Sequence, residues 1–170
     1  MTTEPTSLHE LPEIAISVRQ PWAWAIVHAG KHLENRQWGS WNHHLKRQRG
    51  PICIHASSGM TRNEYEDARD FMERFGVACP EPADLVRGGI IGTAVIVDWV
   101  RTSHSFWFMG PGALSLRNMT PLPEPIHCPG ALGFFRWQRQ GEMTPPAKWM
   151  LPKKAKPEPE VAGFKHPRLL

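Results

Sequence analysis

The sequence has few of the residues that build disulfide frameworks or structural metal sites. Its three cysteines, Cys53, Cys79 and Cys128, are an odd number at wide spacing, and none belongs to a CxxC pair. This pattern argues against a disulfide scaffold and a zinc knuckle, so we expect free thiols. The adjacent His43 and His44 have no cysteine or carboxylate partner at ligand spacing. We therefore expect no bound metal, and no motif indicates a cofactor.

Long apolar runs and nucleotide-binding loops are also missing. The longest apolar run, residues 90–100, is interrupted by Gly92, Thr93 and Asp98 and is too short for a membrane span of ~18–20 residues. Residues 1–13 are acidic and lack the apolar stretch of a secretory signal. Neither a GxGxxG nor a GK[ST] motif is present. We expect a cytoplasmic protein with no membrane partner.

The composition is rich in tryptophan and mildly basic. Tryptophan occurs eight times and tyrosine once, and the formal net charge is +4. A positive balance of this size is compatible with a polyanionic partner but does not identify one. Proline and lysine concentrate near the C-terminus. We expect a flexible arm at 1–12, one domain at 13–140 and an extended tail at 141–170. Trp149, Met150 and Leu151 are the tail residues that could pack on the domain.

Short elements alternate along the expected domain. The patterns predict helices at 20–29 and 61–75 and strands at 13–18, 31–36, 51–57, 90–100, 113–118 and 131–138. Three prolines between residues 120 and 125 are expected to prevent regular structure there. About six short strands with two main helices favour an α+β domain around a small, mostly antiparallel β-barrel.

The helix at 61–75 combines a capping box with an acidic face. Thr61 and Glu64 have the spacing of the capping box, and an apolar stripe follows. The outer face carries five carboxylates, at Glu64, Glu66, Asp67, Asp70 and Glu73. Because carboxylates repel phosphates, we expect this face to point away from any nucleic-acid site.

Basic and aromatic residues are interleaved between residues 31 and 49. This segment has five basic residues and one acidic residue, together with two tryptophans and three histidines. In an extended chain, Glu34 and Arg36 share one face, whereas Lys31 shares the other face with Leu33. Basic residues beside aromatic rings are typical of proteins that hold phosphates and stack bases. A solvated basic loop with its tryptophans packed on the barrel explains the composition equally well.

Four segments carry a resemblance to a known family. Residues 17–38 contain SVRQPWA, then GK, ENR and Trp38. Residues 49–56, 89–95 and 121–134 follow in the family's order. Over residues 14–140 the chain thereby resembles ASCH domains, closest to bacterial and phage members, within the PUA-like superfamily. The resemblance implies a PUA-like β-barrel with a cleft beside the first helix, in a superfamily used for RNA binding and for reading modified bases. The residues that match the family's signature are Gln20, Trp22, Lys31, Glu34 and Arg36, with His55 in a later segment.

These observations predict a module that binds RNA, another single-stranded nucleic acid or a nucleoside, including one with a modified base. Gln20 and Glu34 are candidates for reading a base edge, and His55 either lines the cleft or is satisfied by backbone at the barrel rim. The phosphate-binding candidates are Arg19, Lys31, Arg36, Lys46, Arg47 and Arg49, and the stacking candidates are Trp22, Trp38 and Trp41.

Besides nucleic-acid binding, two other functions are compatible with the sequence: an enzyme that acts on a nucleoside or RNA, and a protein-interaction module. One branch of ASCH proteins removes the acetyl group of N4-acetylcytidine with a lysine, a threonine three residues later and a glutamate. Lys31 matches that lysine, but Glu34 occupies the threonine position, which argues against the known route and leaves a base–water mechanism with Lys31 and Glu34 as catalytic groups. Some ASCH proteins are described as ribonucleases. The third function is a protein-interaction module that uses the tail or the acidic helix.

Overall fold

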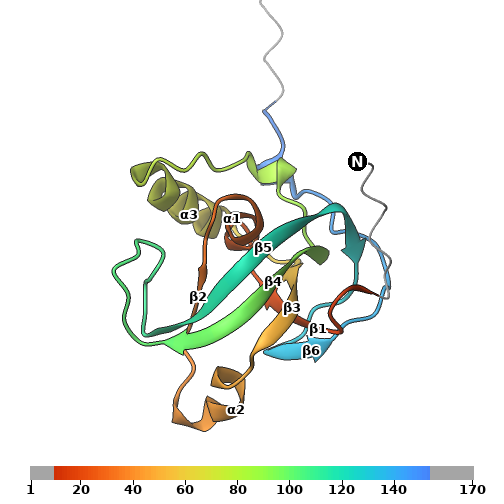
Figure 1. The fold of residues 1–170 in the computed structure, drawn as a ribbon. Coiled ribbons are helices and arrows are strands. Elements are labelled where there is room, and N and C mark those ends of the chain that lie inside the picture. Colours follow the sequence, from red (N-terminus) through yellow and green to blue (C-terminus); the bar gives the residue numbers. More distant parts are fainter. Residues whose placement is uncertain (1–9, 154–170) are drawn as a thin grey trace, which may run out of the picture.

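Six strands and three α-helices alternate along residues 10–153, which are the residues described by the computed structural model (Figure 1). In chain order they are β1 (Ile14–Val18), α1 (Trp22–His28), β2 (Leu33–Arg36), α2 (His43–Lys46), β3 (Gly50–Ala56), α3 (Arg62–Arg74), β4 (Gly89–Val100), β5 (Gly112–His127) and β6 (Phe134–Arg136). Three short 3₁₀ turns complete the set: η2 (Ser40–Asn42), η3 (Pro82–Asp84) and η4 (Lys148–Met150).

The strands form one curled sheet in the order β2-β5-β4-β3-β1-β6. All neighbours are antiparallel except β1 and β3, which are parallel and place Ser17 opposite His55. The expected α+β class with six strands is confirmed. The sheet is a half-barrel, because β2 and β6 stand at its two edges. A third helix, the four-residue α2, lies in the segment expected to be a loop.

The prediction that three prolines prevent regular structure at 120–125 is wrong. Strand β5 runs through all of them, and Pro121 lies opposite Gly92 of β4. Strand β2 pairs only with the beginning of β5, so the later part of β5 has one open edge. Prolines two residues apart direct their missing N–H positions toward the same edge, where no ladder hydrogen bond is lost.

Helix α1 packs against β3, β4 and β5 and fills the curl of the sheet. It buries Ala23, Ala25, Ile26 and Val27, and it ends before Gly30, which has a φ of +71°. A Cβ atom at Gly92 would lie 2.4 Å from a Val27 methyl group, so the close approach of helix and sheet requires glycine there. The ends of β1 and β3 therefore lie beside the first turn of α1.

Helix α3 confirms the predicted capping box. The Thr61 hydroxyl accepts a hydrogen bond from the Glu64 N–H, and the Glu64 carboxylate accepts one from the Thr61 N–H. Tyr65, Ala68 and Met72 form its buried stripe. The helix is thus fixed over α1 by one face.

The segment that follows β6 returns along the domain. The Thr144 N–H donates to the Arg87 carbonyl at 2.8 Å, and the Arg87 guanidinium donates to the Pro145 carbonyl at 2.8 Å. Met150 is buried beside Tyr65. The start of the expected tail therefore packs on the domain, whereas 154–170, and most of the expected arm, at 1–9, lie outside the described residues. Within 10–153, no helix is both long and apolar enough to cross a bilayer.

Candidate functional site

Lys31, Glu34 and Arg36 form a charge cluster at the edge strand β2. Lys31 is only 1% exposed, and its ammonium group donates to Glu34 Oε2 at 3.0 Å and to the Leu33 carbonyl. The other Glu34 oxygen lies 3.4 Å from Arg36 Nε, so these two side chains share a face as predicted. The prediction that Lys31 points to the opposite face is wrong. Lys31 precedes β2, where strand alternation does not apply, and its long side chain turns toward Glu34.

This burial makes Lys31 and Glu34 structural in the observed arrangement. Two acceptors occupy the Lys31 ammonium group, and neither residue lines the two surface hollows described below. Gln20 is also 2% exposed and uses both ends of its amide: Nε2 donates to the Val86 carbonyl and Oε1 accepts from the Trp24 N–H. These contacts anchor the first turn of α1.

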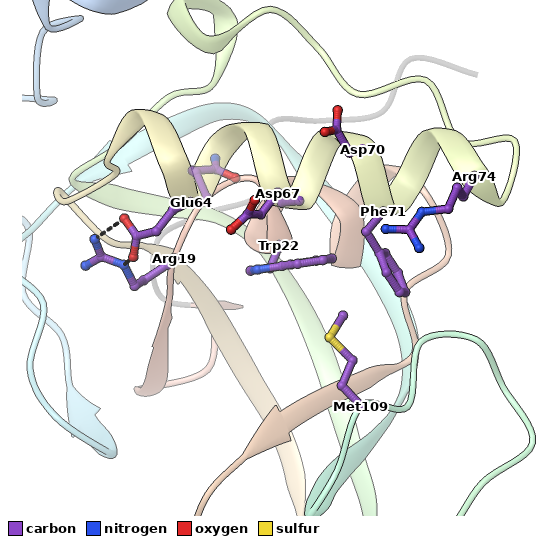
Figure 2. A pocket seen from close by; sticks show the side chains of 10 residues that line it. Arg19, Trp22, Glu64, Asp67, Asp70, Phe71, Arg74 and Met109 are labelled. Carbon is purple, nitrogen blue, oxygen red and sulfur yellow. Dashed lines mark hydrogen bonds and ion pairs between the residues drawn. The ribbon is translucent and has the colours of Figure 1, made fainter.

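The first hollow lies between α1 and α3 and has a volume of about 470 Å³. Figure 2 shows the Trp22 indole edge-on beneath α3, with Phe71 to one side and Met109 below. The Trp22 and Phe71 rings meet edge to face, with centroids 5.7 Å apart. The residues that line the first hollow are Arg19, Gln20, Trp22, Glu64, Asp67, Ala68, Asp70, Phe71, Arg74 and Met109.

The acidic face of α3 borders the first hollow. Glu64 and Asp67 lie on the Trp22 side of α3 in Figure 2, and Asp70, whose Oδ1 accepts from Arg69, is also among the residues that line the first hollow. The expectation that this face points away from any nucleic-acid site therefore does not fit a nucleic-acid site in the first hollow. Burying the stripe through Ala68 against the domain brings the neighbouring helix positions over α1, and those positions carry the carboxylates.

Arg19 and Glu64 form a two-point ion pair at one end of the first hollow. The guanidinium donates to the two carboxylate oxygens at 2.6 and 2.7 Å. The same carboxylate caps α3 at the Thr61 N–H. The hydrogen bonds from Arg19 are the main reason that the pKa of Glu64 falls from 4.5 to about 2.

Acid is therefore expected to weaken the fold through Glu64. A lowered pKa in the folded state stabilises the protein above pH 4.5, and this contribution is lost as the pH falls from 4.5 to about 2. Because the Glu64 side chain is 39% exposed, solvent screening limits the effect to roughly 1 kcal/mol. Urea denaturation between pH 6 and pH 2 measures it: Glu64→Gln should show a flatter stability curve than the wild type. Glu66→Gln, an exposed position on α3, is the control. Parallel curves for wild type and Glu64→Gln would contradict the assignment.

The second hollow, about 520 Å³, lies at the ends of β1 and β3. Arg19 lines both hollows and therefore joins them. Arg36 reaches the second hollow from β2, and its Nη2 donates to the Ser17 carbonyl at 2.7 Å. No carboxylate lines the second hollow, whose residues are Ser17, Arg19, Arg36, His55, Ser57, Ser58, Gly130, Ala131, Leu132 and Gly133.

Two loops supply the rest of the second hollow. The backbone N–H groups of Ser58 and of residues 130–133 have no hydrogen-bond acceptor among the described residues 10–153. Free N–H groups in loops are suited to binding an anion. Two arginines thus line a space without a carboxylate, and the loops beside it carry N–H groups that have no acceptor among residues 10–153.

His55 is buried beneath the second hollow and combines both of its predicted roles. Its Nε2 lies 2.9 Å from the Cys128 carbonyl, and its Nδ1 lies 2.7 Å from Ser17 Oγ. The ring is therefore satisfied by backbone on one side and reaches a residue that lines the hollow on the other. Burial lowers the pKa of His55, so the imidazole is neutral near pH 7.

Most of the remaining predicted residues lie on a separate basic ridge, which comprises η2, α2 and residues 47–49 and carries Trp41, Lys46, Arg47 and Arg49 (Figure 1). Trp38 is not free to stack a base on both faces, because it stacks on Trp99 with centroids 5.4 Å apart. Trp41 is 81% exposed, and the Arg47 side chain is exposed without a partner among the described residues. Lys46 lies over the Trp99 ring, and Arg49 donates to the carbonyls of Lys46 and Gln48 and approaches Asp98 at 3.4 Å.

The basic ridge lies at the beginning of β3, and the second hollow lies at its end. A Cβ atom at Gly133 would lie 3.3 Å from Leu45 of α2, so the ridge still meets the rim of the second hollow. The structure thus brings Arg19, Gln20 and Trp22 together at one hollow and Arg19, Arg36 and His55 at the other. The residues of both hollows lie apart from those of the basic ridge.

Comparison with known proteins does not assign the chain to a family. No protein-family model matches the chain, and no curated protein is detectably similar to it. Among residues 10–153, no three histidine, cysteine, aspartate or glutamate side chains are placed to hold a metal ion. The arguments for function therefore rest on the two hollows themselves.

Several lining residues were not among the predicted site residues. Phe71 belongs to the apolar stripe of α3, which indicated only core packing, and Met109 lies in a long loop between β4 and β5. Ser57 and Ser58 directly follow β3, and Gly130–Gly133 precede β6. Small residues at strand ends were the available signal, because such loops let backbone N–H groups face a ligand.

Proposed function

We propose that this chain binds single-stranded nucleic acid, RNA in the first place, with one base in the first hollow and a neighbouring phosphate in the second. One observation carries the proposal: the carboxylates gather at one hollow and are absent from the other, while Arg19 joins the two. A nucleotide complements this separation of charge, because its base carries hydrogen-bond donors that suit the carboxylates and its phosphate is negative.

The first hollow has the features of a base-binding site. Trp22 and Phe71 offer aromatic surface for stacking, and Met109 adds a soft apolar contact. Asp67 can accept a hydrogen bond from the exocyclic amino group of a base, and it repels phosphate. Stacking in a hollow requires a base that has left a duplex, so the proposal specifies a single strand or an extruded base.

The second hollow has the features of a phosphate-binding site. Lys31 and Arg36 carry two positive charges against the single negative charge of Glu34, so the cluster beside this hollow has a net charge of +1. Arg36 can add a charge-assisted hydrogen bond to a phosphate oxygen, and the N–H groups of Ser58 and residues 130–133 can add further ones.

The basic ridge extends this surface. Arg47 and Trp41 are exposed there, and Leu45 meets the rim of the second hollow at Gly133. A strand that leaves the second hollow can therefore place further phosphates beside Arg47 and a base on Trp41. The half-barrel and the likeness of residues 17–38 to ASCH domains agree with this proposal, and the PUA-like assignment is part of it.

The hydrolase alternative centred on Lys31 and Glu34 has less support. A base–water mechanism needs a carboxylate and an ammonium group that reach a substrate. Lys31 is buried and donates to two acceptors, and neither Lys31 nor Glu34 lines one of the two hollows. We therefore assign these two residues to positioning Arg36.

Binding is expected to be steeply salt-dependent and to weaken on charge reversal at Arg47. Fluorescence anisotropy with labelled single-stranded RNA, DNA of the same sequence and free nucleosides measures it at two salt concentrations. Three phosphate contacts predict a slope of about 2 in a plot of log Kd against log salt concentration, at ~0.7 per phosphate. Arg47→Glu should weaken binding about tenfold and reduce the slope by about 1.

Lys148→Glu is the matched control for this experiment. Lys148 is exposed in η4 and lines neither hollow, so its reversal should leave the salt slope unchanged. Absence of binding, or binding that does not respond to salt, would contradict the proposed function.

A further inference from the structure

We propose that Ser17 and His55 form a nucleophile–base dyad in the second hollow, which hydrolyses esters that carry a negative charge. The inference is independent of nucleic-acid binding. It rests on the contact between the two side chains, on the access of Ser17 to the hollow and on the guanidinium group beside it.

The hydrogen bonds fix the roles of the two imidazole nitrogens. A carbonyl oxygen only accepts, so the contact between His55 Nε2 and the Cys128 carbonyl at 2.9 Å places the ring proton on Nε2. In the neutral ring Nδ1 then carries the lone pair, and the Ser17 hydroxyl donates to it at 2.7 Å. This is the arrangement in which a base can take the proton of an attacking hydroxyl.

Rigid elements hold the dyad in place. Ser17 and His55 are register partners in the parallel pair β1 and β3, and Phe135 meets the His55 ring edge to face. His55 is 1% exposed, whereas Ser17 is half-buried and lines the second hollow. A Cβ atom at Gly130 would lie 2.9 Å from Ser17 Oγ and 2.7 Å from His55 Cε1, so only glycine fits this close to the two side chains.

The surroundings select a substrate with an anionic group. Arg36 Nη2 donates to the carbonyl of Ser17 itself, which places a guanidinium group beside the nucleophile. No carboxylate lines this hollow to oppose an anion. The unpaired N–H groups of residues 130–133 are candidates to stabilise the oxyanion that forms during attack.

The reaction proceeds in two steps, acylation of Ser17 and hydrolysis of the acyl-serine. Ser17 Oγ attacks the ester carbon while its proton moves to His55 Nδ1, and the bond to the alcohol oxygen then breaks as His55 returns the proton to the leaving alcohol. Water attacks the resulting acyl-serine, gives a proton to Nδ1 and releases the acid as Ser17 recovers its hydrogen. The Cys128 carbonyl stabilises the transient imidazolium, in the place where other triads use a carboxylate. Because the carbonyl fixes the tautomer but carries no full charge, we expect slower turnover than in enzymes with that carboxylate, by at most about 10⁴-fold.

Labelling with diisopropyl fluorophosphate tests the dyad. The expected product is a Ser17 Oγ–phosphorus bond with loss of fluoride, detected by intact mass and located by peptide mapping. Ser17→Ala should abolish labelling, and His55→Gln should slow it at least about 100-fold, as expected for loss of a general base. Ser103→Ala is the control, since Ser103 is exposed in the loop between β4 and β5 and lines neither hollow, and this variant should label at the wild-type rate.

A pair of esters tests the charge preference. The wild type should hydrolyse mono-4-nitrophenyl terephthalate, whose carboxylate cannot reach its own ester, faster than 4-nitrophenyl benzoate, and Arg36→Met should remove that preference while Ser17 still labels. Wild-type protein that is folded but unlabelled, or labelling that survives Ser17→Ala, would overturn the dyad. Equal rates for the two esters would overturn the anionic substrate class. Neither outcome depends on whether RNA binds.

Discussion

Glu34→Ala is expected to lower the free energy of unfolding by about 3–5 kcal/mol, the largest stability change that we predict. The substitution leaves the Lys31 ammonium group 1% exposed with only the Leu33 carbonyl as partner. Removing one member of a buried ion pair strands the other charge away from water, which costs far more than the pair contributes. Urea denaturation of the wild type and the variant measures the difference.

Two further variants isolate the charge as the cause. Glu34→Gln keeps an acceptor for Lys31 but removes the negative charge, so its loss should be intermediate. The double variant Lys31→Met, Glu34→Ala removes both charges and should be more stable than Glu34→Ala alone. If Glu34→Ala costs less than about 1 kcal/mol, Lys31 is not held as described.

Trp22→Ala is expected to weaken binding of single-stranded RNA by about 10- to 100-fold. Stacking of one base on an aromatic ring contributes ~1–3 kcal/mol, and Trp22 is the central ring of the first hollow. Fluorescence anisotropy at fixed salt concentration measures the change, and Trp22→Phe should recover most of the affinity because it keeps an aromatic face.

The Trp22 variants must be shown to be folded, because this ring also packs against the core. Thermal unfolding of both variants shows whether the binding experiment was done on folded protein. A folded Trp22→Ala variant that binds RNA as tightly as the wild type would contradict a base in the first hollow.

The sequence predicted local structure well where a local signal decides it. The capping box of α3 and the end of α1 before Gly30 depend on residues within one or two turns, and both were found. Strand β5 was mistaken because the effect of its prolines depends on whether the neighbouring strand β2 extends that far. That is a property of the whole sheet.

The candidate site was predicted only in part, for the same reason. Residues 17–38 drew attention to Arg19, Trp22 and Arg36, which all line a hollow. Burial of Lys31, however, depends on how the chain turns before β2. The carboxylates of α3 reach Trp22 only through tertiary packing, and Met109 arrives there from a distant loop. Charge and spacing alone therefore do not reveal that the acidic helix borders the first hollow.

The most direct test of a base in the first hollow is to observe each tryptophan indole N–H by NMR while single-stranded RNA is added. The chain has eight tryptophans, and Trp22→Phe identifies the relevant signal. The Trp22 signal should shift in proportion to bound RNA, while that of Trp137, whose Nε1 donates to the Pro12 carbonyl and which lines neither hollow, stays in place. A Trp22 signal that does not move while RNA binds, with shifts confined to Trp41 on the basic ridge, would contradict the account.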